Sequence, residues 1–164
     1  MMSRAYVGIG SNMGDRIEHL RAGLTALMGA APDVIVIGQS RVYESAPVGM
    51  TDQPDFCNAV VALETTLGPY QLLDLIHEIE IKNGRQRITR WGPRTLDLDI
   101  LLFGDLEQHD PDLTIPHPRL RERRFVLEPL LEIDPQAKLP DGTPLSSLLD
   151  TLGDEGPTWC AGQL

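Results

Sequence analysis

Residues 90–104 read Arg90-Trp91-Gly92-Pro93-Arg94-Thr95-Leu96-Asp97-Leu98-Asp99-Ile100-Leu101-Leu102-Phe103-Gly104, and they indicate both the class of fold and the place of the site. Its first half is rich in Gly, Pro and Arg, which is typical of a loop. Its second half is an apolar run that predicts a buried strand over residues 97–103. Side chains two residues apart on a strand point to the same face, with Cα atoms about 6.6 Å apart. The pattern therefore places Asp97 and Asp99 side by side.

Two carboxylates on one face among Leu and Ile side chains are costly unless a positive charge lies between them. Mg²⁺ is the natural partner, because it prefers carboxylate oxygens. Arginines at 85, 87, 90 and 94 lie just upstream and favour a phosphate group as the ligand of loop and metal together. The stretch thus predicts a phosphoryl-transfer site. The alternative is a solvated strand edge, since an Asp-x-Asp pair alone is a weak signal.

Composition and charge narrow the class of protein. A chain of 164 residues with 41% apolar and 23% charged residues fits one soluble globular domain over 1–164. The net charge of −10 argues against nucleic-acid binding. Residues 84–124 nevertheless hold 8 of the 14 basic residues, which indicates either a focused site for a small anion or a chance cluster of solvated arginines.

The sequence also bears on location and partners. No apolar run reaches the roughly 18 residues of a membrane span, and the first residues lack the apolar core of a signal peptide. Cys57 and Cys160 show neither metal-ligand spacing nor a disulfide framework. We expect a cytoplasmic monomer with reduced thiols, small-molecule substrates and no membrane partner.

The periodicity predicts an alternation of strands and helices. We expect strands over 4–10, 34–43, 56–66 and 97–103, and helices from the Gly-Ser-Asn turn to about residue 29 and over 69–83. Short helices over 125–133, interrupted at Pro129, and over 144–152 precede a loose tail over 153–164. The order β-α-β-β-α-β predicts an α+β, ferredoxin-like sandwich, with an antiparallel or mixed sheet and its helices on one face.

Two local patterns allow more than one interpretation. The Gly-rich segment 8–14 lacks the G-x-x-x-x-G-K-[ST] pattern of a phosphate loop, so we interpret Ser11 or Asn12 as a helix N-cap. Phe56 and Asn58 share one face of their strand, where they could hold a flat heterocycle with an amide edge. The alternative is a Phe in the core and an Asn in a turn.

The sequence of residues 90–104, followed by Ile-Pro-His-Pro at 115–118 and Arg-x-Phe at 123–125, resembles the 6-hydroxymethyl-7,8-dihydropterin pyrophosphokinase family of folate biosynthesis. The resemblance runs from the Gly-Ile-Gly-Ser-Asn turn at 8–12 to about Asp150. It implies the same ferredoxin-like fold. It also implies transfer of pyrophosphate from ATP to the hydroxymethyl group of a dihydropterin, with release of AMP and use of two Mg²⁺ ions.

The resemblance assigns roles by position. Asp97 and Asp99 match the metal-binding aspartates. Arg85 and Arg94 match arginines that contact the phosphates, and with the aspartates they form the implied catalytic group. Trp91 matches a residue that seals the closed site. Residues matching the family's ATP contacts are His77, Glu80, Arg87, Ile100, Leu113, Thr114, His117 and Arg123. Residues matching its pterin contacts are Ser45, Ala46, Pro47, Val48, Phe56, Asn58 and Phe125. His117 could instead be a structural residue between two prolines.

The chain departs from the family pattern in places. Phe56 stands where Tyr is frequent and His77 where Gln occurs. Asp112 replaces a basic residue near ATP, and Pro118 replaces an aromatic. Two other functions compete with the main one: nucleotidyl transfer, which also pairs a Gly-Ser turn with Asp-x-Asp, and a non-catalytic binding module. Ser11 and Asp97 are too far apart in sequence for the former, and two metal carboxylates are unneeded in the latter.

Overall fold

The computed structural model describes residues 1–46, 52–84, 95–152 and 158–164. Its helices are α1 (Arg16–Met28), α2 (Pro69–Lys82), α3 (Arg124–Ile133) and α4 (Leu145–Leu152), with a 3₁₀ turn η1 (Leu120–Glu122). Its strands are β1 (Ser3–Ser11), β2 (Val34–Gln39), β3 (Val42–Ser45), β4 (Phe56–Thr65), β5 (Asp97–Phe103), β6 (Gln108–His109), β7 (Thr114–Ile115) and β8 (Thr158–Gly162).

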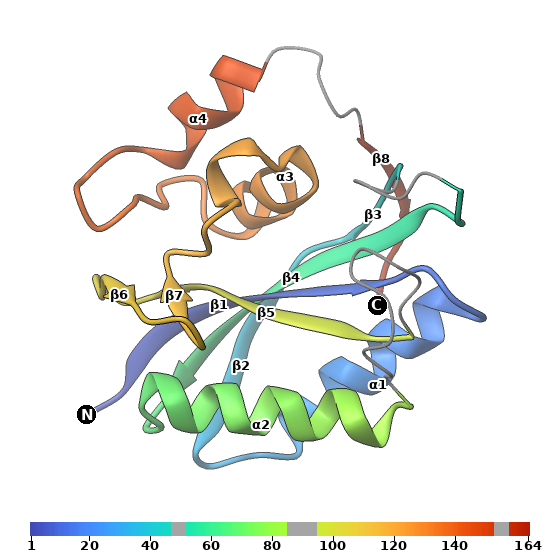
Figure 1. Cartoon of the computed structure of the whole chain (residues 1–164), viewed down its shortest axis with the longest axis horizontal. Helices are drawn as coiled ribbons and strands as arrows, with labels where there is room; N and C mark the ends of the chain where they lie inside the picture. Colours follow the sequence, from blue (N-terminus) through green and yellow to red (C-terminus); the bar gives the residue numbers. More distant parts are fainter. Residues whose placement is uncertain (47–51, 85–94, 153–157) are drawn as a thin grey trace.

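One antiparallel sheet runs through the middle of the molecule (Figure 1). Its order is β5-β1-β4-β3-β8, and β2 also pairs with β4. The two longest described strands, β1 and β4, lie side by side with Ser3 opposite Thr65 and Ser11 opposite Cys57. Strands β1, β4 and β5 lie where a ferredoxin-like sandwich has its first, third and fourth strands, so the predicted fold class is confirmed.

The predicted second strand over 34–43 is instead two strands, β2 and β3, which pair with different parts of β4. The break lies at Ser40, whose backbone N–H donates to the Val60 carbonyl at 2.9 Å. Its hydroxyl accepts the Val60 N–H, also at 2.9 Å. The Ser40 hydroxyl thus takes the place of a backbone carbonyl as the acceptor for the Val60 N–H. The apolar pattern of the sequence gives no sign of this exchange.

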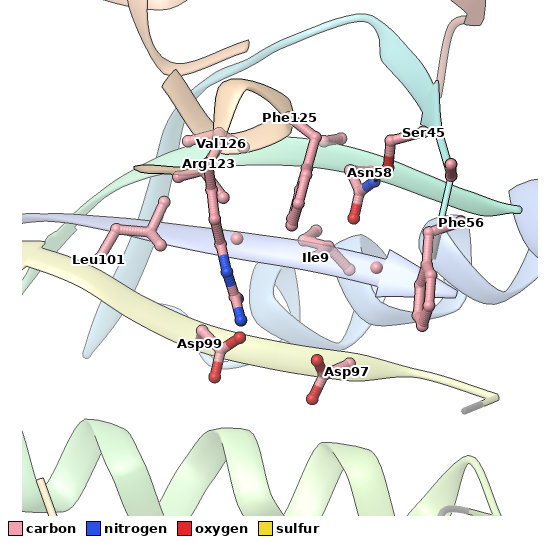
Figure 2. A pocket seen from close by; sticks show the side chains of 15 residues that line it. Ile9, Ser45, Phe56, Asn58, Asp97, Asp99, Leu101, Arg123, Phe125 and Val126 are labelled. Atoms are coloured by element: carbon pink, nitrogen blue, oxygen red, sulfur yellow. Dashed lines mark hydrogen bonds between the residues drawn. The ribbon is translucent and has the colours of Figure 1, made fainter. Parts of the chain in front are cut away.

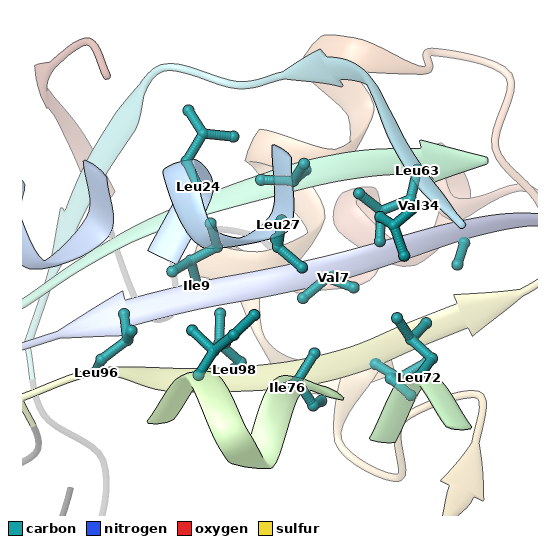
Figure 3. Close-up of a cluster of buried hydrophobic side chains, with 14 of the residues drawn as sticks. Val7, Ile9, Leu24, Leu27, Val34, Leu63, Leu72, Ile76, Leu96 and Leu98 are labelled. Atoms are coloured by element: carbon teal, nitrogen blue, oxygen red, sulfur yellow. The ribbon is translucent and has the colours of Figure 1, made fainter. Parts of the chain in front are cut away.

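Helices α1 and α2 cover one face of the sheet (Figure 1). Leu20, Leu24 and Leu27 of α1, and Leu72 and Ile76 of α2, pack on Val7, Ile9 and Leu98 of the sheet (Figure 3). The helical spacing of these leucines and isoleucines is the reason that both segments bury one face. The predicted cap of α1 is wrong: Asp15, not Ser11 or Asn12, accepts the backbone N–H of Glu18 at 3.2 Å.

The opposite face of the sheet is covered by α3 and α4 (Figure 1), around a second core that includes Leu101, Leu127 and Leu130. The predicted interruption at Pro129 is wrong, because α3 continues through it. Pro129 lacks an N–H for the Phe125 carbonyl, but the flanking Leu127 and Leu130 are fully buried and hold the helix on the sheet.

The predicted loose tail is also corrected. Residues 158–162 form β8, which pairs antiparallel with β3. Leu164 packs against the first core. A segment as short as Thr158–Gly162 carries no clear period, so only the pairing partner reveals the strand. No helix in the described ranges is long and apolar enough to cross a membrane.

Candidate active site

Two cavities meet at the start of β5. The inner cavity lies on the α3 side of the sheet and is lined by Gly8, Ile9, Gly10, Ser45, Ala46, Phe56, Asn58, Ala59, Val60, Asp97, Asp99, Leu101, Arg123, Phe125 and Val126 (Figure 2). The outer cavity is lined by Leu73, Ile76, His77, Asp97, Leu98, Asp99, Ile100, Pro111, Asp112, Leu113, Thr114, His117 and Pro118. Asp97 and Asp99 belong to both cavities.

The aspartates lie on one face of β5, as the spacing predicts, and Figure 2 shows both side chains at the edge of the inner cavity. Both are partly exposed, and 40% of the Asp99 side chain is accessible. Within the described ranges, no three His, Cys, Asp or Glu side chains gather as a ready-made metal cage.

Pairing register explains why the inner cavity is open. Gly10 of β1 lies opposite Asp97 of β5 and opposite Asn58 of β4. Residues opposite each other in a sheet present their side chains to the same face. Asp97 and Asn58 therefore face one another across two strand spacings, about 10 Å, over a residue that has no side chain.

Glycine is required at that position. A Cβ on Gly10 would lie 2.9 Å from Asn58 Oδ1, and one on Gly8 would lie 3.6 Å from Leu101. Sequence reasoning missed both glycines as site residues. The available signal was a Gly-x-Gly pattern inside a strand, which often marks close approach of a ligand or backbone.

The far wall of the inner cavity combines aromatic and polar groups. Phe56 and Phe125 project into it, with Asn58 between them in the view of Figure 2. Asn58 is 8% exposed, and its Nδ2 donates to Ser45 Oγ at 2.9 Å. This bond fixes the amide and leaves its Oδ1 as an acceptor toward Gly10 and the cavity.

Arg123 supplies a positive charge next to the aspartates. It precedes α3, and its guanidinium carbon lies 5.5 Å from the centre of the Phe125 ring. Figure 2 shows the side chain reaching down toward Asp99. Burial lowers the pKa of Arg123, while the neighbouring Asp99 opposes that shift, so the group stays charged at neutral pH.

His117 faces the same pair from the outer cavity. Its backbone N–H donates to the Leu101 carbonyl at 3.0 Å, and its Nδ1 accepts the Arg119 N–H at 3.1 Å. Its Nε2 lies 3.9 Å from Asp99 Oδ1. Burial, and then the charge of Arg123, lowers the pKa of His117 to about 4. The ring is therefore neutral at pH 7, with its Nε2 as the donor.

The other predicted residues fall into three groups. Ser45 and Ala46 line the inner cavity, and His77, Ile100, Leu113 and Thr114 line the outer one. Glu80 lines neither: it is 1% exposed and accepts the Leu98 N–H at 2.9 Å behind the aspartate strand. The residues that lie outside the described ranges are Pro47, Val48, Arg85, Arg87, Trp91 and Arg94.

Residues 6–135 match the family model for 7,8-dihydro-6-hydroxymethylpterin-pyrophosphokinase (HPPK). Proteins named 2-amino-4-hydroxy-6-hydroxymethyldihydropteridine pyrophosphokinase are similar to the chain. The Pseudomonas aeruginosa protein is 46% identical over 95% of this chain and 96% of its own length. The Bacillus subtilis protein is 47% identical over 84% and 82%, respectively.

A solved structure supports the fold. The chain superposes on the crystal structure of Plasmodium falciparum HPPK-DHPS wild type with pteroate, with a TM-score of 0.72 and 15% identity. The match covers 92% of this chain and 42% of the Plasmodium chain. This chain therefore spans less than half of that longer protein, and the likeness concerns architecture alone.

Proposed function

The chain belongs to the 7,8-dihydro-6-hydroxymethylpterin-pyrophosphokinase family, and we propose how its residues divide the work of that family's reaction. The reaction transfers pyrophosphate from ATP to the hydroxymethyl group of 6-hydroxymethyl-7,8-dihydropterin in folate biosynthesis. The hydroxyl oxygen forms a bond to the β-phosphorus as that atom's bond to the α,β-bridging oxygen breaks. AMP leaves with the electron pair, and the hydroxyl proton is released.

The observation that carries the assignment of residues is the row Asn58, Gly10 and Asp97 across three adjacent strands. A flat bicyclic ring lying on Gly10 with its amide edge at Asn58 would span the roughly 10 Å to β5. Its hydroxymethyl group would then reach the aspartates. The inner cavity is the pterin site in this proposal, and the outer cavity is the ATP site.

The pterin site combines stacking with hydrogen bonding. Phe56 and Phe125 offer ring faces to a planar substrate. The Asn58 amide, held by Ser45, presents Oδ1 as an acceptor for ring N–H donors. Ala46 lies beside Ser45 at the rim, and we assign the adjacent Pro47 and Val48 to the same loop on the strength of the resemblance.

The ATP site is apolar at its base and polar at its rim. Ile100 and Leu113 are at most 6% exposed and give an adenine ring two aliphatic surfaces. His77, Asp112 and Thr114 offer polar groups for the base or the ribose. Glu80 acts indirectly in this proposal, because it holds the Leu98 backbone between the two aspartates.

Asp97 and Asp99 fit a pair of Mg²⁺ ions. Their hard carboxylate oxygens are partly exposed at the junction of the two cavities, where the triphosphate would enter. The two carboxylates would hold the ions, and the positive charge supplied in this way would offset the negative charge that develops at the β-phosphorus.

Cationic and neutral donors complete the phosphate site. The charged Arg123 and the neutral His117, a donor at Nε2, approach the aspartates from opposite cavities. Each can donate hydrogen bonds to phosphate oxygens. From the resemblance we add Arg85, Arg87 and Arg94 as phosphate contacts and Trp91 as a cover over the closed site.

We propose that the enzyme acts as a monomer on ATP and the dihydropterin, whose proposed sites are the two cavities. We place its activity in the cytoplasm, where ATP is available. Gel filtration of the active enzyme tests the monomer: activity that elutes only at twice the monomer mass would contradict it.

The direct test of function is AMP release from ATP and Mg²⁺, with and without 6-hydroxymethyl-7,8-dihydropterin, with the products identified by mass. We expect AMP and a pterin diphosphate only when the pterin is present. ADP would indicate transfer of a single phosphoryl group and would contradict attack at the β-phosphorus. Pterin binding with no nucleotide product would instead indicate a binding module.

A further inference from the structure

We propose that Asn12 and Arg16 form a brace that positions Phe56 for stacking on the pterin. The brace rests on the proposed assignment of the inner cavity as the pterin site. Neither residue lines that cavity. Both act on the short segment Gln53–Asp55, which leads directly into Phe56, and they are therefore positioning residues rather than catalytic ones.

Asn12 holds the first part of this segment. Its Nδ2 donates to Gln53 Oε1 at 2.8 Å and to the Pro54 carbonyl at 3.0 Å. The residue is 1% exposed, so its amide is withdrawn from water and committed to protein groups. Asp15 caps α1, so the capping role that the sequence suggested for Asn12 is already filled.

Arg16 holds the second part. Its Nη1 donates to the Asp55 carbonyl at 2.9 Å and pairs with Glu44 Oε1 at 2.5 Å. Glu44 lies opposite Cys57 in the sheet and immediately precedes Ser45, the partner of Asn58. Arg16 thus joins two flanks of the cavity. The hydrogen bond that Arg16 donates to the Glu44 carboxylate raises the pKa of Arg16, which keeps the guanidinium charged.

The segment depends on these contacts because residues 52–55 form no helix or strand. Its backbone receives bonds from Asn12 at Pro54 and from Arg16 at Asp55, the two residues before Phe56. Phe56 begins β4, so a shift of the preceding backbone would tilt its ring first. Asn12, the residue directly after β1, therefore has a positioning role in this proposal without touching a phosphate.

The test compares Asn12→Ala, Gln53→Ala and their double variant with Thr65→Val. Gln53→Ala removes the hydrogen bond between Asn12 and Gln53 without changing the buried Asn12. Because Gln53 is only half-buried, this variant still tests the brace if Asn12→Ala fails to fold. Thr65 is a matched control. It is fully buried at the far end of β4, and its hydroxyl donates to the Asp33 carbonyl at 2.7 Å.

We expect Asn12→Ala to weaken pterin binding about tenfold, as loss of two hydrogen bonds suggests, while the KM for ATP changes less than twofold. Gln53→Ala should act in the same direction, and the double variant should be less than additive because the two residues share a bond. Thr65→Val should lower stability without changing pterin affinity. Two results would show a merely structural role and overturn the brace. One is that Asn12→Ala weakens the binding of pterin and of ATP equally, and the other is that Thr65→Val weakens pterin binding tenfold.

A readout without substrate separates the brace from the proposed function. Amide hydrogen exchange over residues 52–58 should accelerate at least about tenfold in Asn12→Ala relative to the wild type, with no ligand present. Faster exchange in a protein whose wild type binds no pterin would support the brace and contradict the pterin site. Unchanged exchange together with unchanged pterin affinity would overturn the brace alone.

Discussion

In the proposed function, the two aspartates at the start of β5 serve the transfer step rather than pterin recognition. We expect Asp97→Asn and Asp99→Asn each to lower kcat by roughly 10²–10³-fold, because each removes a negatively charged oxygen ligand where Mg²⁺ offsets phosphate charge. Pterin affinity should change little, since ring contacts come from Phe56, Asn58 and Phe125. Steady-state kinetics and pterin titration measure the two effects.

Asp105→Asn is the matched control for the aspartate variants. Asp105 is exposed in the turn after β5 and lines neither cavity. Its variant should keep wild-type kcat. Full turnover in Asp97→Asn and Asp99→Asn would contradict the metal assignment.

Gly10 is the second residue-scale prediction. In Gly10→Ala the new Cβ would lie 2.9 Å from Asn58 Oδ1, whose amide is fixed by Ser45. Either the amide moves or the pterin loses its flat surface, so the KM for pterin should rise about tenfold or more with the KM for ATP nearly unchanged. Gly38→Ala is the control, because its nearest atom is Ala62 Cβ at 3.9 Å. Equal KM values for pterin in the two variants would contradict the role of Gly10.

The difference between these residues shows what sequence could reveal about the site. Asp97 and Asp99 are two apart in one strand, so their common face follows from local geometry. Gly10 matters because it lies opposite both Asp97 and Asn58. That register joins three strands from distant parts of the chain, and a local pattern carries no information about it.

Among the elements, α3 connects the second core to the site, because Arg123 and Phe125 lie at its start. Its far end is fixed to β1 by Tyr6, whose hydroxyl donates to Asp134 Oδ2 at 2.5 Å. Burial and this bond raise the pKa of Tyr6 to about 12. The phenol is therefore protonated, and a donor, at neutral pH.

Tyr6→Phe removes only that hydroxyl. We expect the free energy of unfolding to fall by about 1.5–3 kcal/mol, the usual value for a hydrogen bond to a charged group. Urea denaturation measures this loss. Tyr70→Phe is the control, since Tyr70 is 43% exposed and accepts only a 3.3 Å bond from Gln108; its stability should stay within 0.5 kcal/mol of the wild type. Equal stability of the two variants would contradict the anchor.

The elements also show which features a sequence predicts well. The strongly periodic α2 and the apolar β5 were predicted nearly to the residue, because burial of one face or of the whole strand fixes their pattern. The division of 34–45 into β2 and β3 and the pairing of β8 were missed. Both depend on hydrogen bonds between segments that are distant in sequence. In the first case the Val60 N–H donates to the Ser40 hydroxyl, and in the second case β8 pairs with the backbone of β3.

At the scale of the whole molecule, charge is separated. The chain carries −10 overall, yet the basic residues concentrate over 84–124, the part of the sequence that includes Asp97, Asp99, His117 and Arg123. In the proposed function, this arrangement would attract the ATP polyphosphate to one place, because the rest of the chain is strongly acidic. The sequence alone shows that basic residues concentrate over 84–124. Only the fold shows that Arg123 and His117 approach the aspartates from different cavities.

Metal removal should therefore stop turnover without unfolding the protein. Two cores on opposite faces of the sheet hold the fold, and no metal-binding group of three side chains lies in the described ranges. Excess EDTA should abolish AMP release and leave the melting temperature within about 1 °C, because two carboxylates alone bind Mg²⁺ weakly.

Mg²⁺ with a non-hydrolysable ATP analogue should raise the melting temperature by several degrees, since ligand that binds only the folded state adds RT ln(1 + [L]/Kd). The analogue should raise the melting temperature of Asp97→Asn much less than that of the wild type, whereas it should raise that of Asp105→Asn as much. A large drop in melting temperature with EDTA alone would mean that a metal is part of the fold, and that the aspartates bind it before ATP arrives.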